Sequence, residues 1–191
     1  MCGIAGFTTD RRVDSSNIMK EMLQSIEHRG PDESNQLSFE KISLGHVRLS
    51  IIDIANGQQP MQSRDQRYTL TFNGEIYNYL ELRQQLVSQS IQLETYSDTE
   101  VLLHMYIQYG KEMLNHLNGM FAFAIYDNLT DELFVARDHF GVKPFYFYSD
   151  NDFFAFASEI KALLRHPNIG ASVDDHSIHE YLTFQFVLHD K

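Results

Sequence analysis

The sequence predicts an α+β domain in which two stacked, mainly antiparallel sheets are covered by helices. Apolar residues alternate over seven short segments separated by polar turns, which predicts strands at residues 4–7, 44–52, 68–72, 120–126, 132–136, 145–148 and 153–157. Helices are expected at residues 18–26, 80–87, 101–109, 159–164 and 175–184. Strands with helices before and after them fit a layered domain.

Local signals set the ends of two of these helices. Ser15 or Ser16 is expected to cap the first helix, because a serine side chain accepts from an unpaired N–H at a helix start. Ser97 and Glu100 have the spacing of a capping box, and Gly110 is expected to end the helix that they open.

Length and composition set the class of protein. The chain has 191 residues, which corresponds to one domain spanning 1–191, and 43% of them are hydrophobic, enough for a sizeable core. A formal charge of −11 argues against nucleic-acid partners. We see neither an apolar run long enough to cross a membrane nor a secretory signal, and the single cysteine suits a reducing cytoplasm.

The single cysteine is Cys2, directly after the initiator methionine. If Met1 is removed, one residue carries both a thiol and an α-amine, and the neutral amine can accept the thiol proton to leave a nucleophilic thiolate. A retained Met1 would lock that amine in a peptide bond, so the unprocessed chain should be inactive. Taken alone, a cysteine here also fits a small buried hydrophobe.

Asn73 and Gly74 follow the strand at 68–72. A side-chain amide and a backbone N–H in adjacent residues could form an oxyanion hole. Asn-Gly is also a common hairpin turn, and by itself this pattern favours the turn.

Three charged residues could bind a small polar substrate. Arg48 lies in the polar phase of an apolar strand, where it could clamp a carboxylate or face solvent. Asp98 fits a helix cap better than a site for an ammonium group. With Glu75, these residues together describe a pocket for a free α-amino acid whose side-chain carbonyl is attacked.

We expect no metal site and no nucleotide site within these residues. His176 and His179 have helical spacing but no third ligand nearby, and structural metal sites need more ligands. No glycine-rich phosphate loop occurs in the chain.

Nine ordered segments resemble one known family. They include Met1-Cys2-Gly3-Ile4 at the start and Phe72-Asn73-Gly74-Glu75 in the middle, and they occupy residues 1–7, 28–32, 45–53, 57–61, 72–78, 97–100, 118–124, 136–144 and 157–163. The chain resembles the N-terminal glutaminase domain of the glutamine-hydrolysing asparagine synthetases, which are class II glutamine amidotransferases. The resemblance covers nearly the whole chain.

This resemblance implies a four-layer α/β/β/α sandwich of the N-terminal-nucleophile hydrolase type. It implies that the chain hydrolyses L-glutamine and supplies ammonia to a synthetase domain expected beyond Lys191, with ATP and Mg²⁺ bound only in that domain and aspartate as the acceptor. The family also allows a homodimer. The implied site residues are Cys2 as nucleophile, Asn73 and Gly74 as oxyanion donors, Arg48 for the α-carboxylate, Leu49, Ile51 and Ile52 as lining, and Glu75 and Asp98 for the α-ammonium.

Three alternatives stay open at this point. The domain could serve a different ammonia acceptor, it could sense glutamine without catalysis, or it could be an acylase of the same type with an unrelated amide substrate. Arg48, Glu75 and Asp98 favour a free amino acid over a simple amide.

Overall fold

Two antiparallel sheets form the centre of the molecule in the computed structural model, which describes residues 1–9, 14–50, 56–150 and 153–188. The first sheet has the order β2-β3-β1-β9-β8 and contains β1 (Gly3–Thr8), β2 (Glu33–Ser38), β3 (Ile42–Arg48), β8 (Tyr146–Ser149) and β9 (Phe154–Ala157). The second has the order β4-β5-β6-β7 and contains β4 (Met61–Gln62), β5 (Tyr68–Ile76), β6 (Gly119–Asp127) and β7 (Glu132–Arg137).

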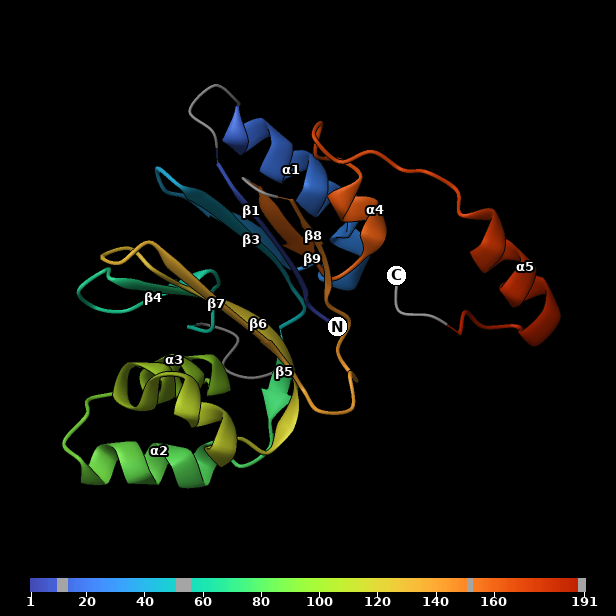
Figure 1. Ribbon diagram of the computed structural model, residues 1–191. Helices are drawn as coiled ribbons and strands as arrows, with labels where there is room; N and C mark the ends of the chain where they lie inside the picture. Colours follow the sequence, from blue (N-terminus) through green and yellow to red (C-terminus); the bar gives the residue numbers. More distant parts are fainter. Residues whose placement is uncertain (10–13, 51–55, 151–152, 189–191) are drawn as a thin grey trace.

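Helices cover the outer faces of both sheets (Figure 1). The first sheet is covered by α1 (Ser15–Ser25) and α4 (Ile160–Leu163), and the second by α2 (Tyr79–Ser88) and α3 (Asp98–Tyr109). Short 3₁₀ segments follow α1 (η1, Glu27–Arg29) and α3 (η2, Gly110–His116). The last helix, α5 (Asp175–Phe184), lies beside these layers. The four-layer α/β/β/α sandwich is therefore confirmed.

Three hydrophobic clusters separate the four layers. One lies between α1, α4 and the first sheet, another between the second sheet and α2 with α3. The third fills the space between the sheets and contains Ile4, Leu44, Ala122, Ala124 and Phe156, each fully buried. Small alanines on β6 opposite large side chains on the first sheet let the two sheets pack closely.

The expected turn at Asn73-Gly74 is wrong. Both residues lie inside β5, where Asn73 pairs with Ala122 and Gly74 with Phe121 of the antiparallel strand β6. A Cβ built on Gly74 would lie 2.3 Å from the Met120 carbonyl oxygen, so the glycine is needed for close approach of the strands and not for a turn. Pairing over nine residues of β5 outweighs the local turn signal.

Helix caps differ partly from expectation. Asp14, and neither serine, caps α1 through a hydrogen bond from Asn17 N to its side chain. Ser97 caps α3 as predicted, accepting from Glu100 N at 3.2 Å, and Gly110 ends the helix. The reciprocal half of the capping box is missing, because the Glu100 carboxylate accepts instead from residues 94 and 95.

Strands β2 and β4 were not predicted from the sequence. β2 is a largely polar edge strand, and β4 has only two residues, so neither carries a strong hydrophobic alternation. The strand expected at 44–52 runs from Ile42 to Arg48, while residues 51 and 52 lie outside the described part of the chain.

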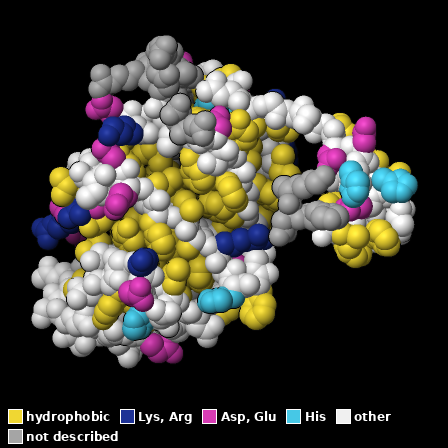
Figure 2. Space-filling view, in the orientation of Figure 1, with side chains coloured by type: hydrophobic (Ala, Val, Ile, Leu, Met, Phe, Trp, Pro, Cys, Tyr) yellow, Lys and Arg dark blue, Asp and Glu magenta, His cyan; other side chains and the backbone are white. Residues whose placement is uncertain are grey.

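Hydrophobic side chains gather over the middle of the face seen in Figure 2, with charged ones mainly around them. None of the helices in the described ranges is both long enough and apolar enough to span a bilayer.

Candidate active site

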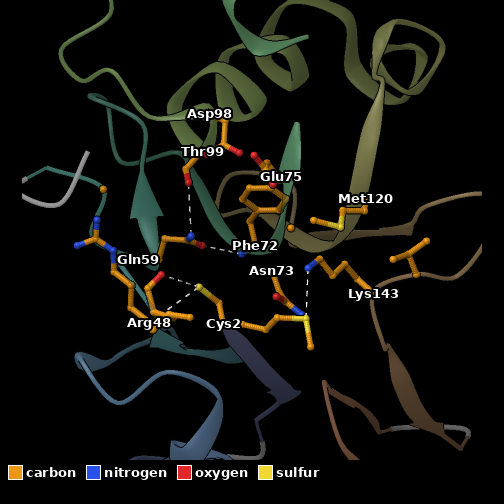
Figure 3. A pocket seen from close by; sticks show the side chains of 15 residues that line it. Cys2, Arg48, Gln59, Phe72, Asn73, Glu75, Asp98, Thr99, Met120 and Lys143 are labelled. Carbon is orange, nitrogen blue, oxygen red and sulfur yellow. Dashed lines mark hydrogen bonds between the residues drawn. The ribbon is translucent and has the colours of Figure 1, made fainter. Parts of the chain in front are cut away.

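One cavity of about 270 Å³ collects the chemistry-bearing residues of both sheets (Figure 3). Its lining includes Cys2, Arg48, Leu49, Asn73, Gly74, Glu75 and Asp98, residues that the sequence analysis selected. Ile51 and Ile52, expected as further lining, lie outside the described residues. The volume is slightly below the usual range for pockets that bind drug-sized ligands and suits a small polar metabolite.

Cys2 stands just before β1, at the end of the first sheet that faces the cavity. Its Sγ accepts a hydrogen bond from Leu49 N at 3.4 Å and lies 3.6 Å from Leu49 O, to which the thiol can donate. The Arg29 Nε donates to the Cys2 carbonyl at 3.0 Å. The residue is half-buried, so its sulfur is held in position and still reached from the cavity.

Buried polar contacts align the two sheets at this end. His46 on β3 donates from Nε2 to the Phe72 carbonyl of β5 at 3.1 Å, and Thr71 Oγ1 donates to the Gly45 carbonyl at 3.1 Å. Burial lowers the pKa of His46 to about 3, so the imidazole is neutral and acts as a structural donor. These contacts hold β5 against β3, the neighbour of strand β1, which begins directly after Cys2.

Asn73 and Gly74 present donors to the cavity. The Asn73 side chain is buried, and its Nδ2 has no hydrogen-bond partner among the residues that the structure describes. Successive N–H groups of a strand point to opposite edges. Phe72 N donates to Gln59 Oε1 at 2.7 Å and Ile76 N to Asp98 Oδ2 at 3.1 Å, so Gly74 N, between them, points to the same edge, away from β6.

Arg48 is buried, which rules out the solvent-facing interpretation. It is 4% exposed, its Nη1 donates to Glu33 Oε1 at 2.8 Å, and it lines the cavity. Glu33 belongs to the edge strand β2, paired with Arg48 across the sheet. This partner fixes the guanidinium at one side of the cavity.

Asp98 is the first residue of α3 and is not its cap, which is Ser97. Burial raises the pKa of Asp98 to about 6, and the charge of Glu75 adds to this effect, while the hydrogen bond from Ile76 N opposes it. Figure 3 shows Glu75 and Asp98 together at the side of the cavity away from Cys2. A ligand cation placed there would be attracted by both carboxylates.

Gln59 and Arg29 also contribute to the site, although no sequence pattern singled them out. Gln59 is buried and joins β5 to α3, accepting from Phe72 N and donating from Nε2 to Thr99 Oγ1 at 3.4 Å. Arg29 pairs with Glu159 at 3.0 Å, and its Nε donates to the Cys2 carbonyl. Both residues lie in segments that resemble the known family, and this resemblance was the one sequence feature that could have indicated them.

Lys143 was also missed, because the pattern around it fits an ordinary turn with an Arg137–Asp138 ion pair. The structure places these two side chains on backbone groups instead: Arg137 donates to the Lys143 and Gly141 carbonyls, and Asp138 accepts from Phe121 N, at 3.2 Å, and Lys143 N, at 3.0 Å. Lys143 itself is 5% exposed and lines the cavity.

No cluster of three or more His, Cys, Asp or Glu side chains suited to a metal ion occurs in the described ranges. The cavity presents a thiol, an amide, backbone N–H groups and charged side chains.

The comparison with protein-family models decides the assignment. The model described as "Glutamine amidotransferase domain" matches residues 1–191. The chain belongs to this family. The match covers every residue of the cavity, including Cys2 and Asn73.

Curated relatives are glutamine-hydrolysing asparagine synthetases. The chain is 44% identical over 178 residues to "Asparagine synthetase [glutamine-hydrolyzing] 3" of Bacillus subtilis, an alignment covering 91% of this chain and 29% of that protein. It is 40% identical to "Asparagine synthetase B [glutamine-hydrolyzing]" of Escherichia coli, covering 86% of this chain and 30% of that protein. The chain thus spans less than a third of the length of these relatives.

Solved structures support the fold. A glutamine phosphoribosylpyrophosphate amidotransferase from B. subtilis, complexed with ADP and GMP, superposes with a TM-score of 0.70 at 27% identity over 85% of this chain and 43% of that one. A structure described as the allosteric regulatory enzyme of purine biosynthesis gives 0.73 at 27% identity, over 86% of this chain and 43% of that one. The expected N-terminal-nucleophile hydrolase fold is confirmed.

Proposed function

We propose that this domain hydrolyses L-glutamine to glutamate and ammonia through a thioester on Cys2. The observation that carries the proposal is the meeting, in one cavity, of the Cys2 thiol with a buried Asn73 amide that lacks a partner in the described structure and a Gly74 N–H at the open edge of β5. A nucleophile next to two converging donors is what acyl transfer requires.

Glutamine binds with its α-carboxylate at Arg48 and its α-ammonium at Glu75 and Asp98. Arg48 lies on one side of the cavity and the two carboxylates lie on another, while Cys2 lies below them in Figure 3. This separation matches an amino acid whose ends are held apart and whose side chain reaches the thiol. A guanidinium suits the carboxylate because it donates two parallel hydrogen bonds.

The reaction then proceeds in two stages. Once Met1 is removed, the α-amine of Cys2 accepts the thiol proton, and the thiolate adds to the side-chain carbonyl carbon of glutamine. Asn73 and Gly74 stabilise the oxyanion, and the α-ammonium returns the proton as the C–N bond breaks and ammonia leaves. Water, deprotonated by the same amine, hydrolyses the thioester to glutamate and regenerates the thiol.

The ammonia passes to an ATP-dependent synthetase domain, which we propose follows this domain and amidates aspartate to asparagine. The names of the curated relatives and the fraction of their length that this chain spans support that arrangement. ATP and Mg²⁺ belong to the synthetase domain in this proposal. We place the enzyme in the cytoplasm because its thiol needs reducing surroundings. Self-association and the lack of nucleic-acid and membrane partners stay predictions.

Ammonia release from glutamine tests the proposal. The processed wild-type protein should release ammonia and glutamate in equal amounts, and Cys2→Ala should release neither while still binding glutamine. Binding without turnover in the wild type would favour a glutamine-sensing module, and preference for simple acyl amides would favour an acylase. Asparagine formation from aspartate, glutamine and ATP by the full-length protein tests the acceptor.

A further inference from the structure

Lys143 is a charged side chain inside the cavity that the proposed reaction does not yet use. It is 5% exposed and lies in the loop between β7 and β8, across the cavity from Arg48 in Figure 3. Among the described residues, its Nζ makes one hydrogen bond, a weak one of 3.5 Å to the sulfur of Met1. That partner is lost when Met1 is removed.

The loop holds Lys143 in place independently of Met1. The Asp138 carboxylate accepts from the N–H groups of Phe140, Val142 and Lys143, and Arg137 donates to the carbonyl of Lys143. Burial alone would raise the pKa of Asp138, but these backbone donors keep the pKa below its usual value, so the carboxylate stays ionised and the loop stays clamped. These contacts hold the backbone of Lys143 in a fixed position beside the cavity.

Lys143 lies close to the backbone nitrogen of Cys2, which becomes the free α-amine when Met1 is removed. The Met1 sulfur and the Cys2 nitrogen are separated by a few covalent bonds, so the Lys143 Nζ lies within about 10 Å of the future α-amine. Burial lowers the pKa of Lys143, and the positive charge of Arg29 lowers it further. The negative charges of a Cys2 thiolate, Glu75 and Asp138 act in the opposite direction. The attraction between ammonium and thiolate is mutual.

We propose that Lys143 is a positioning residue of the reaction, whose ammonium stabilises the Cys2 thiolate and keeps the neighbouring α-amine in its neutral, proton-accepting form. A single positive charge favours both states, because it attracts the anionic sulfur and disfavours a second cation beside it. Among the described residues, the other charged groups beside Cys2 or lining the cavity are Arg29, which donates to the Cys2 carbonyl, and Arg48, Glu75 and Asp98, which bind the amino acid in the proposed function. The inference rests on that function.

Alkylation of Cys2 tests the inference without glutamine. Protein processed to begin at Cys2 is treated with iodoacetamide over pH 5.5–9.5, and the modified N-terminal peptide is quantified by mass spectrometry. Lys143→Met should move the midpoint of the pH–rate profile up by about one unit, and slow alkylation at pH 7 about tenfold. Lys143→Arg should keep the midpoint of the wild type, because it keeps the charge and cannot act as a base.

Lys111→Met, an exposed lysine in η2, is the matched control and should leave the profile unchanged. An unchanged midpoint in Lys143→Met would overturn the inference, and so would an Arg variant that shifts as far as the Met variant. If thermal unfolding shows that Lys143→Met is misfolded, Lys143→Gln carries the same expectation.

Ammonia release separates this inference from the proposed function. In Lys143→Met the loss of turnover should be confined to the acid side of the pH profile and recover at high pH. If Cys2 alkylation responds as expected but no ammonia is released by the wild type, the function fails and the inference stands. If ammonia is released and the alkylation midpoint is the same with and without Lys143, the inference is refuted and the proposed function stands.

Discussion

Asp98 Oδ2 accepts a hydrogen bond of 3.1 Å from the backbone N–H of Ile76, two residues beyond Gly74. This bond ties the start of α3 to β5 and places a carboxylate beside the strand that carries both candidate oxyanion donors. Gln59 ties the same two elements together through Phe72 and Thr99. The start of α3 therefore positions both the proposed ammonium site and the proposed oxyanion site.

Asn73→Ala should lower glutamine turnover by about 10²–10³-fold, while glutamine binding stays nearly unchanged. The reason is that the amide donor acts on the oxyanion of the transition state, which the bound substrate lacks. Steady-state kinetics and glutamine titration of the Cys2→Ala background check the two halves. Asn115→Ala, an exposed asparagine in η2, is the control. Unchanged turnover would refute the role given to Asn73.

Arg48→Lys should weaken glutamine binding by roughly 10–100-fold, the loss expected for a charged hydrogen bond of about 1.5–3 kcal/mol. A lysine keeps the charge near Glu33 but cannot make two parallel bonds to a carboxylate. Isothermal titration in a Cys2→Ala background measures the affinity. If binding is unaffected and thioester formation collapses instead, Arg48 has been misassigned.

Glutamine affinity should fall as pH drops through about 6, because Asp98 becomes protonated there and loses its attraction for the α-ammonium. Asp98→Asn should bind weakly at neutral pH and lose this pH dependence. Titrations of the wild type and of Asp98→Asn between pH 5 and 8 provide the check. An acid limb that persists in Asp98→Asn would assign the titration to another group.

The same carboxyl links folding to pH in the absence of ligand. Its pKa is about 6 in the folded protein, above the ordinary value of 3.8 for an aspartate, so between pH 3.8 and 6 the folded state binds a proton that the unfolded state has lost. The contribution of Asp98 to the free energy of unfolding is therefore fully present below pH 3.8. As the pH rises through 6, the free energy of unfolding falls by about 3 kcal/mol. Relative to Asp98→Asn, the wild type should lose stability over this window in urea unfolding. Asp175→Asn, an exposed carboxyl, should track the wild type.

Gly74→Ala should destabilise the domain by about 1–3 kcal/mol, the usual cost of overpacking. Its Cβ would lie 2.3 Å from the Met120 carbonyl oxygen, which belongs to backbone and cannot swing aside. Gly170→Ala is the matched control, since no atom lies within 4 Å of its added Cβ. Equal unfolding midpoints for the two variants would contradict the close approach of β5 and β6.

The layered fold followed from the sequence because most strands and helices carry strong local patterns, such as the alternation over residues 68–72 and the cap at Ser97. Asn73-Gly74 was misread because strand pairing with β6 is a long-range effect that a two-residue signal cannot report. Gln59, Arg29 and Lys143 were missed for a related reason: their burial depends on other elements of the fold, and contacts such as Arg29 to Cys2 and Lys143 to Met1 join segments far apart in the chain.

Unmasking Cys2 tests the central claim most directly. The protein is produced with a removable N-terminal extension, and ammonia release from glutamine is measured before and after cleavage exposes Cys2. We predict no release before cleavage, full release after it, and none from a cleaved Cys2→Ala variant. Equal release with the α-amine still locked in a peptide bond would contradict the account, because the thiol would then need a different base.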